Sequence, residues 1–209
     1  MSLYGAVPSE DDDGREQGPE LPDDHGDENG SQDVAEAEAA FREQATALAR
    51  EHRLLVHLDG ARIFNAAVAS GKDLATYGRL ADTASVCLSK GLGAPVGSLV
   101  VGERRMIDEA RVWRKRLGGG MRQVGVLAAA GLHALDHHVE RLAEDHANAR
   151  LLAEACGVDP ASVDTNIVVV DVPNAAAVVE AARSHGVLVA TVGPSLLRFV
   201  THLDVSRAQ

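Results

Sequence analysis

The sequence predicts an α/β fold followed by a small α+β lobe. Short apolar runs of strand length alternate with longer segments in which apolar residues recur every three or four positions, the spacing of one helix face. Glycine-rich turns separate several of these runs. Apolar residues make up 45% of the 209 residues and aromatic residues only 3%, so we expect a core of aliphatic side chains.

The α/β part is expected to open with an amphipathic helix. Phe41, Ala45, Leu48 and Ala49 share one helix face, which predicts a helix that ends near His52. The apolar run LLVHL suits a buried strand, and two more strands flank the glycine-rich turn KGLGAP. The expected elements that follow the first helix are a strand at 54–58, a helix at 62–69, strands at 84–88 and 97–101, and a helix at 103–116.

The C-terminal part is expected to begin with a long helical segment at 122–155, as two helices or as one helix with a bend. The elements expected beyond it are a strand at 166–172, a helix at 175–185, and strands at 187–190 and 196–201. We see no internal repeat. The predicted division is a leader at 1–34, a partial α/β domain at 35–122, and a helical connection with a small α+β lobe at 123–209.

The negative charge of the chain is concentrated in its first 33 residues. The formal net charge is −11, and this leader holds eleven acidic residues against one basic residue, Arg15. Its low apolar content predicts a disordered segment, because too little surface could be buried to offset the entropy of ordering it. The rest is close to neutral, which argues against a nucleic-acid partner.

The cysteines and the hydropathy favour a cytoplasmic protein. Cys87 and Cys156 lie in apolar stretches without C-x-x-C spacing, as reduced core thiols do. The N-terminus has no apolar run of signal-peptide length, and no stretch approaches the roughly 18 apolar residues of a membrane span. We therefore expect no membrane association.

Lys90 has the most informative setting of the three lysines, which are Lys72, Lys90 and Lys115. It follows an apolar strand and precedes a glycine-rich turn, where partial burial is expected. Burial lowers the pKa of a lysine, and an imine-forming lysine needs a deprotonated amine. The alternative is a strand-end lysine whose amine reaches solvent.

Asp59 closes the strand that precedes Lys90. A carboxylate at the C-terminal end of a strand faces the crevice in which α/β proteins bind ligands, although it could instead cap the next helix. The spacing would place Asp59 and Lys90 on adjoining strands. These are the two groups that a pyridoxal phosphate site needs, because the lysine holds the cofactor as a Schiff base and the aspartate keeps the pyridine nitrogen protonated.

Four long motifs resemble segments of the low-specificity L-threonine aldolases and aromatic amino acid beta-eliminating lyases, in the same order. They are HLDGARIFNAAVASG, CLSKGLGAPVGSLVVG, RKRLGGGMRQVGVLAAAGLHAL and LRFVTHLDVS. The resemblance covers about 35–207. It implies pyridoxal 5'-phosphate as cofactor and part of the aspartate aminotransferase fold, also called fold type I, with the small α+β lobe at its C-terminal end.

The resemblance also implies roles for individual residues. Asp59 would contact the pyridine nitrogen and Lys90 would hold the cofactor. Arg62 and Arg198 would bind the substrate carboxylate, for which a planar guanidinium is suited because it donates two parallel hydrogen bonds. The active sites of the family form at a dimer interface, which implies a homodimer or homotetramer.

Three further basic or polar residues are second-rank candidates. Lys115 and Arg122 flank Gly118-Gly119-Gly120 and match basic residues near the family's active site, or they are ordinary surface charges. Ser89 could contact the cofactor or merely end its strand. His133 and His137 are four apart on a predicted helix, but only two ligands are local, so a polar helix face is the preferred interpretation and no metal site is predicted.

The resemblance predicts a lyase that cleaves a β-hydroxy-α-amino acid into glycine and an aldehyde, or a sibling that catalyses β-elimination. Family members are longer on the N-terminal side, where they carry a phosphate-binding turn and two histidines without a counterpart here. The alternative is therefore a non-catalytic remnant or interaction module with weak or absent cofactor binding. A nucleotide-binding domain is disfavoured, because the chain has neither G-x-G-x-x-G nor a P-loop sequence.

Overall fold

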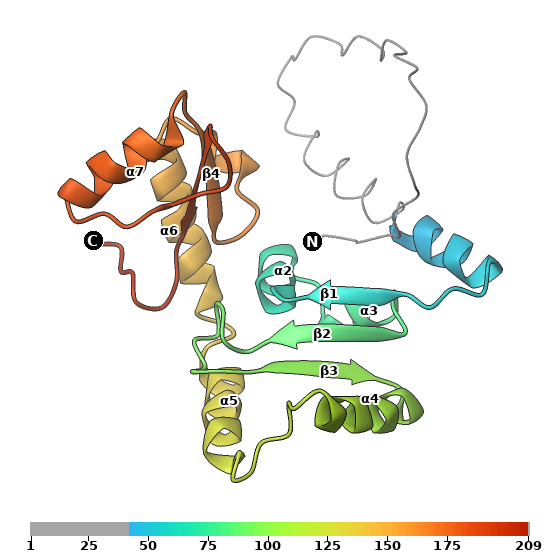
Figure 1. Cartoon of the computed structure of the whole chain (residues 1–209). Coiled ribbons are helices and arrows are strands. Elements are labelled where there is room, and N and C mark those ends of the chain that lie inside the picture. The colour runs from blue at the N-terminus through green and yellow to red at the C-terminus, as the bar shows by residue number, and fades with distance from the viewer. Residues whose placement is uncertain (1–41, 209) are drawn as a thin grey trace.

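The computed structural model describes residues 42–208. The predicted disorder of the acidic leader lies outside these residues. The first described element is a helix at 42–51, which ends one residue before the expected position. The chain then forms two separate sheets, and the helix α6 (Leu142–Ala155) runs between the two parts that contain them (Figure 1).

The first sheet contains β1 (His57–Gly60), β2 (Thr83–Cys87) and β3 (Ser98–Gly102) in that order. β1 and β2 are parallel, whereas β2 and β3 are antiparallel. The connection between the parallel strands contains α2 (Ile63–Ser70) and α3 (Leu74–Gly78). The first core cluster joins these strands and helices through Leu58, Ile63, Tyr77, Ala84 and Val86. The parallel pair with its crossover confirms the predicted α/β class.

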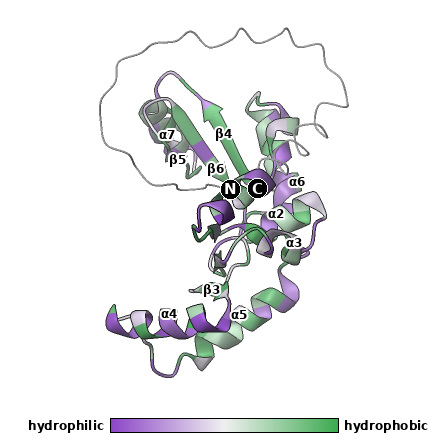
Figure 2. Ribbon diagram, turned by 90° about the vertical axis from the view of Figure 1, so that its right-hand side faces the viewer, coloured by the Kyte–Doolittle hydropathy of each residue, from purple (hydrophilic) through white to green (hydrophobic). Residues whose placement is uncertain are grey.

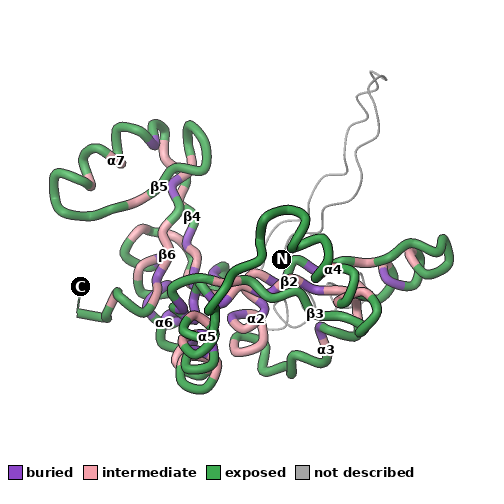
Figure 3. The backbone as a smooth tube through the Cα atoms, turned by 60° about the horizontal axis from the view of Figure 1, so that its bottom comes forward, coloured by how far each residue is buried: buried purple, intermediate pink, exposed green. Residues whose placement is uncertain are grey.

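The strand β3 has little cover in the described part of the chain. All five of its residues are exposed, and α4 (Arg104–Arg116), which follows it, buries no residue. Hydrophilic and hydrophobic residues alternate along α4 (Figure 2), and both elements are mostly exposed (Figure 3). An amphipathic helix and an apolar strand of this kind normally pack against further structure.

Two helices, not one bent helix, fill the predicted helical segment at 122–155. α5 (Gly125–His137) and α6 are separated by a short break, in which the His138 ring nitrogen Nδ1 lies 2.6 Å from the Leu92 carbonyl oxygen. This contact joins the break to the turn that follows β2. The second core cluster lies here and contains Leu88, Leu92, Ala94, Ala134 and Leu142.

The C-terminal lobe is built on a second, fully antiparallel sheet in the order β4-β6-β5. Its elements are the short 3-10 helix η1 (Pro160–Ser162), β4 (Ile167–Asp171), α7 (Ala175–Ser184), β5 (Ala190–Thr191) and β6 (Leu196–Val200). Ala149 and Ala153 of α6 pack with Val163 and Val168 in a third cluster. The lobe matches the expected α+β class.

Three strand and helix positions differ from the sequence prediction. β1 begins three residues later than expected, because Leu54 and Leu55 are 62% and 75% exposed and the pairing with β2 starts only at His57. β5 covers 190–191 instead of 187–190. The short helix α3 was not predicted, although the side chain of its N-cap Asp73 accepts a hydrogen bond from the Thr76 N–H.

Both cysteines, Cys87 and Cys156, are free, as the sequence predicts, but they are half-buried and lie outside the core clusters. Among the described residues, no helix has the length and apolar character that crossing a membrane requires.

Candidate active site

A cavity of about 390 Å³ lies where the end of the first sheet meets the C-terminal lobe. It is lined by the segment that follows β2, by the residue that precedes α2, and by residues around β4 and β6. The lining residues are Arg62, Ser89, Lys90, Gly91, Gly93, Ala94, Asn166, Val200, His202, Leu203 and Asp204. The cavity therefore joins two parts of the chain that are more than 70 residues apart in sequence.

Lys90 sits on a tight backbone turn that is anchored in the core. The Gly93 N–H donates to the Lys90 carbonyl oxygen at 2.9 Å, and the Ala94 N–H donates to the Leu88 carbonyl oxygen at 3.0 Å. Gly93 has a φ of +70°, a conformation that favours glycine. Leu92, only 2% exposed, fixes the turn from below. The Lys90 side chain is exposed, so the expected partial burial is wrong, because the turn carries the side chain beyond the end of the sheet. It lines the cavity, and its amine is accessible to a ligand.

Asp59 lies at the same end of the sheet as Lys90. It pairs with Ser85 across the parallel β1–β2 ladder, and Lys90 lies five residues beyond Ser85. Its carboxylate oxygen Oδ1 accepts a hydrogen bond from the Ala61 N–H at 3.1 Å. Asp59 does not cap α2, since the N-cap residue of that helix is Arg62. Asp59 is exposed and is not among the residues that line the cavity.

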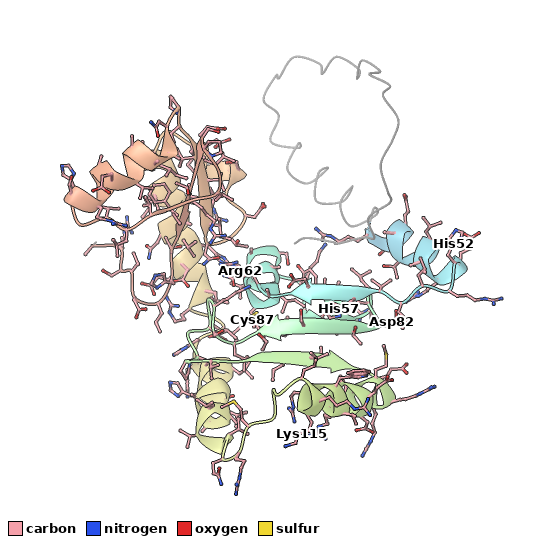
Figure 4. The ribbon with its side chains drawn as sticks, viewed as in Figure 1. His52, His57, Arg62, Asp82, Cys87 and Lys115 are labelled. Atoms are coloured by element: carbon pink, nitrogen blue, oxygen red, sulfur yellow. The ribbon has the colours of Figure 1, made fainter. Side chains whose placement is uncertain are left out.

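Arg62 occupies the cavity wall without a partner for one of its donors. Its Nε atom is buried and makes no hydrogen bond within the described chain. Burial lowers the pKa of Arg62, and the positive charge of Arg198 on β6 lowers it further. Two neighbouring guanidinium groups that repel each other, one of them in the cavity wall, favour the binding of an anion there. Figure 4 shows Arg62 at the end of the sheet that faces the C-terminal lobe.

The cavity does not include every residue that the sequence suggested. Ser89 lines it, whereas Arg198, Lys115 and Arg122 do not. Arg198 is linked to it through its electrostatic effect on Arg62. Lys115 and Arg122 are exposed, and Figure 4 places Lys115 on α4, across the sheet from Arg62.

Asn166 is a cavity residue that sequence reasoning did not select. It is 1% exposed, and its Nδ2 donates to the Thr201 carbonyl oxygen at 2.7 Å, which leaves Oδ1 as a buried acceptor without a partner in the described chain. The only sequence signal for a role of Asn166 in the site was its position directly before the apolar run IVVV, and asparagine at such a position more often belongs to a turn. His202 also lines the cavity.

Two histidines of α5 lie side by side. The rings of His133 and His137 lie 4.5 Å apart between centroids. Across residues 42–208, no group of three or more His, Cys, Asp or Glu side chains could hold a metal ion.

Comparisons with known proteins identify the family. The model of the beta-eliminating lyases matches residues 36–189, which is well over half of the chain. The chain belongs to the beta-eliminating lyase family. The low specificity L-threonine aldolase of Escherichia coli K12 is 50% identical over 174 residues, which cover 81% of this chain and 52% of that protein. The low-specificity L-threonine aldolase 1 of Arabidopsis thaliana is 39% identical over 79% of this chain and 49% of its own length.

Solved structures support the same fold for this beta-eliminating lyase family member. The threonine aldolase of Leishmania major superposes with a TM-score of 0.63 at 23% identity, over 81% of this chain and 53% of that one. The chain therefore has part of fold type I, as the sequence predicts. It spans about half the length of the curated relatives that it matches.

Pyridoxal phosphate is the cofactor of this family, and the residues present fit it. The cavity offers an accessible lysine amine and a cationic wall at Arg62. It also has two buried polar atoms that find no partner within residues 42–208, the Arg62 Nε and the Asn166 Oδ1. Buried polar atoms of native proteins are normally hydrogen-bonded, so two such atoms beside one cavity indicate a site built for a polar ligand.

Proposed function

We propose that this protein acts in a pyridoxal phosphate-dependent carbon–carbon lyase of the threonine aldolase type, which cleaves a β-hydroxy-α-amino acid into glycine and an aldehyde. The observation that supports it best is that Lys90 and Arg62 line one cavity and that the buried Nε of Arg62 has no hydrogen-bond partner among the described residues. The sequence identity of 39–50% with curated L-threonine aldolases supports the same chemistry.

Each residue has a distinct part in this proposal. When bound, the cofactor supplies an electron-accepting ring that stabilises negative charge at the substrate Cα. Lys90 binds the cofactor through its amine, and the Asp59 carboxylate keeps the pyridine nitrogen protonated. Arg62 and Arg198 grip the substrate carboxylate, which orients the Cα–Cβ bond for cleavage. Ser89 contacts the cofactor beside Lys90.

Lys115 and Arg122 remain second-rank substrate contacts in this proposal, since both lie outside the cavity in the described chain. The cytoplasmic location and the homodimeric or homotetrameric state are also part of it. They rest on the resemblance to the family and on the two free cysteines.

A non-catalytic module of the same fold is the competing function. The exposed strand β3, which could contact another protein, favours it. Absorbance spectra of the purified protein with added pyridoxal phosphate separate the two functions. The proposed lyase gives a band at about 420 nm, where an imine of the cofactor absorbs, and Lys90→Ala removes it while Lys72→Ala keeps it. A wild-type chain that stays colourless would support the non-catalytic module.

A further inference from the structure

Directly beneath the turn that holds Lys90 lies a buried polar pair, Asn65 and His146. Asn65 belongs to α2 and is 2% exposed, and His146 belongs to α6 and is 3% exposed. Asn65 Nδ2 lies 3.2 Å from His146 Nε2. Because an amide nitrogen only donates, the ring nitrogen accepts, which places the imidazole proton on Nδ1 and leaves the ring neutral.

The surroundings of His146 favour this neutral ring. Burial lowers its pKa most, and the positive charge of Arg150 lowers it further, while Asp145 acts in the opposite direction. The Asp145 carboxylate is already paired with Arg141 at 2.6 Å, so it is not free to balance a charge on His146. A neutral imidazole can hold the asparagine amide by a hydrogen bond in a site closed to water.

The turn rests on this pair through Gly91, the residue after Lys90. A Cβ atom placed on Gly91 would lie 3.0 Å from Asn65 Oδ1 and 2.9 Å from Leu142 Cδ2. The space beside the Gly91 backbone is therefore filled by the Asn65 amide and a fully buried leucine, with no room for a side chain. Gly91 shares a peptide bond with Lys90, so a shift of Asn65 that displaces the Gly91 backbone would also displace the base of the Lys90 side chain.

The polar character of the pair calls for an explanation that packing does not provide. Apolar side chains of similar volume would fill the same space without the cost of burying polar groups. A hydrogen bond adds direction: it fixes the amide plane of Asn65 against α6. The same helix α2 begins immediately after Arg62. The pair therefore links the backbone segments that carry Lys90 and Arg62 to α6.

We propose that Asn65 and His146 are positioning residues that aim the Lys90 amine into the cavity. The assignment rests on the proposed function only in naming the aldehyde of pyridoxal phosphate as the group that Lys90 meets. The amine adds to the aldehyde carbon and loses water to form a carbon–nitrogen double bond, and added borohydride delivers a hydride that fixes the bond as a stable secondary amine.

The three lysines of the chain make the test internally controlled. The protein is incubated with substoichiometric pyridoxal phosphate and reduced with borohydride, and peptide mass spectrometry gives the label on Lys72, Lys90 and Lys115. In the wild type we expect Lys90 to take most of the label. In Asn65→Leu and His146→Phe its share should fall to about one third, the value for three lysines that react alike. His146→Gln, which retains a neutral acceptor, should keep most of the Lys90 preference.

Amide hydrogen exchange gives a readout that needs no cofactor. The Gly93 and Ala94 amides, which close the turn by hydrogen bonds, should exchange faster in Asn65→Leu, while those of β4 and β6 stay protected. A folded Asn65→Leu protein that keeps the wild-type Lys90 share overturns the inference. If the wild type shows no preference for Lys90, the proposed function fails, and amide hydrogen exchange then tests the positioning role by itself. In that case, Gly93 and Ala94 amides that exchange equally fast in Asn65→Leu and in the wild type overturn the positioning role.

Discussion

At the scale of single residues, His146 should make stability depend on pH. Its folded pKa lies below the ordinary value of 6.5, so the unfolded chain binds more protons in the interval between the two values. Stability therefore rises with pH across this interval. The contribution of the neutral ring is fully present above about 6.5 and is lost as the pH falls toward the lower folded pKa.

The measurement is the thermal midpoint between pH 5 and pH 8 for the wild type and for His146→Gln. The difference between the two curves should narrow toward acidic pH, because glutamine does not titrate. A difference that is constant with pH would contradict a neutral buried His146.

Arg62 provides a second prediction at this scale. Charge-assisted hydrogen bonds contribute about 1.5–3 kcal/mol each, so Arg62→Leu should weaken the binding of L-threonine to the cofactor-loaded protein by about tenfold or more. Titration calorimetry measures this loss. Arg183→Leu on the exposed side of α7 changes the net charge equally and is the matched control. Equal affinities in both variants would remove Arg62 from the carboxylate site.

At the scale of secondary-structure elements, the glycine of the Lys90 turn should tolerate no side chain. An added Cβ on Gly91 meets Leu142 and Asn65, both tightly packed, so Gly91→Ala should destabilise the fold by about 1–3 kcal/mol through overpacking. Gly78 at the end of α3 has no atom within 4 Å of an added Cβ, so Gly78→Ala is the control and should be neutral or slightly stabilising. Urea unfolding compares the two. Equal midpoints would mean that the turn is loosely packed.

The cap of α7 offers a simpler test of an element. Asn174 Oδ1 accepts a hydrogen bond from the Ala177 N–H at 3.1 Å. Asn174→Ala should therefore cost about 1 kcal/mol in the free energy of unfolding, whereas Asn174→Ser should retain most of it, because serine caps helices as well as asparagine does. Urea unfolding measures both values, provided that the slope of the unfolding free energy against urea concentration is unchanged.

The elements that sequence patterns predicted well are those with a strong local signal. The apolar runs of β2, β4 and β6 and the amphipathic face of α4 are visible in a few consecutive residues. β1 was placed too early because a run such as Leu54–Leu55 becomes a strand only where a neighbouring strand pairs with it. Likewise, the Asn65–His146 pair could not be foreseen, since its two residues are 81 positions apart and meet only through the packing of α2 on α6.

The candidate site shows the same division between local and long-range information. The Lys90 turn and Arg62 could be selected from short motifs. Asn166 could not, because its importance comes from a cavity that forms only when the C-terminal lobe meets the first sheet. The separation of Lys115 from the cavity is also a long-range result, set by the position of α4 beside β3.

At the scale of the whole molecule, the uncovered apolar surface should govern solution behaviour. Leu99, Val100 and Val101 of β3 are 44–51% exposed, and Trp113 and Leu117 are 50% and 81% exposed nearby in sequence. Contiguous apolar surface next to an open strand edge promotes association between chains. We therefore expect the average mass to rise with protein concentration between about 1 and 100 μM, a range in which exposed strand edges aggregate.

The substitution Val100→Lys should suppress this association, because a charge on an exposed strand opposes edge-to-edge pairing while surface changes alter stability by only about 0.5 kcal/mol. Leu188→Lys is the matched control: Leu188 is 84% exposed, but it lies in the C-terminal lobe, away from β3. Sedimentation velocity over a concentration series compares the three proteins. If both lysine variants reduce association equally, the surface around β3 is not the contact surface, whereas an effect confined to Val100→Lys identifies that surface as the one through which the chains meet.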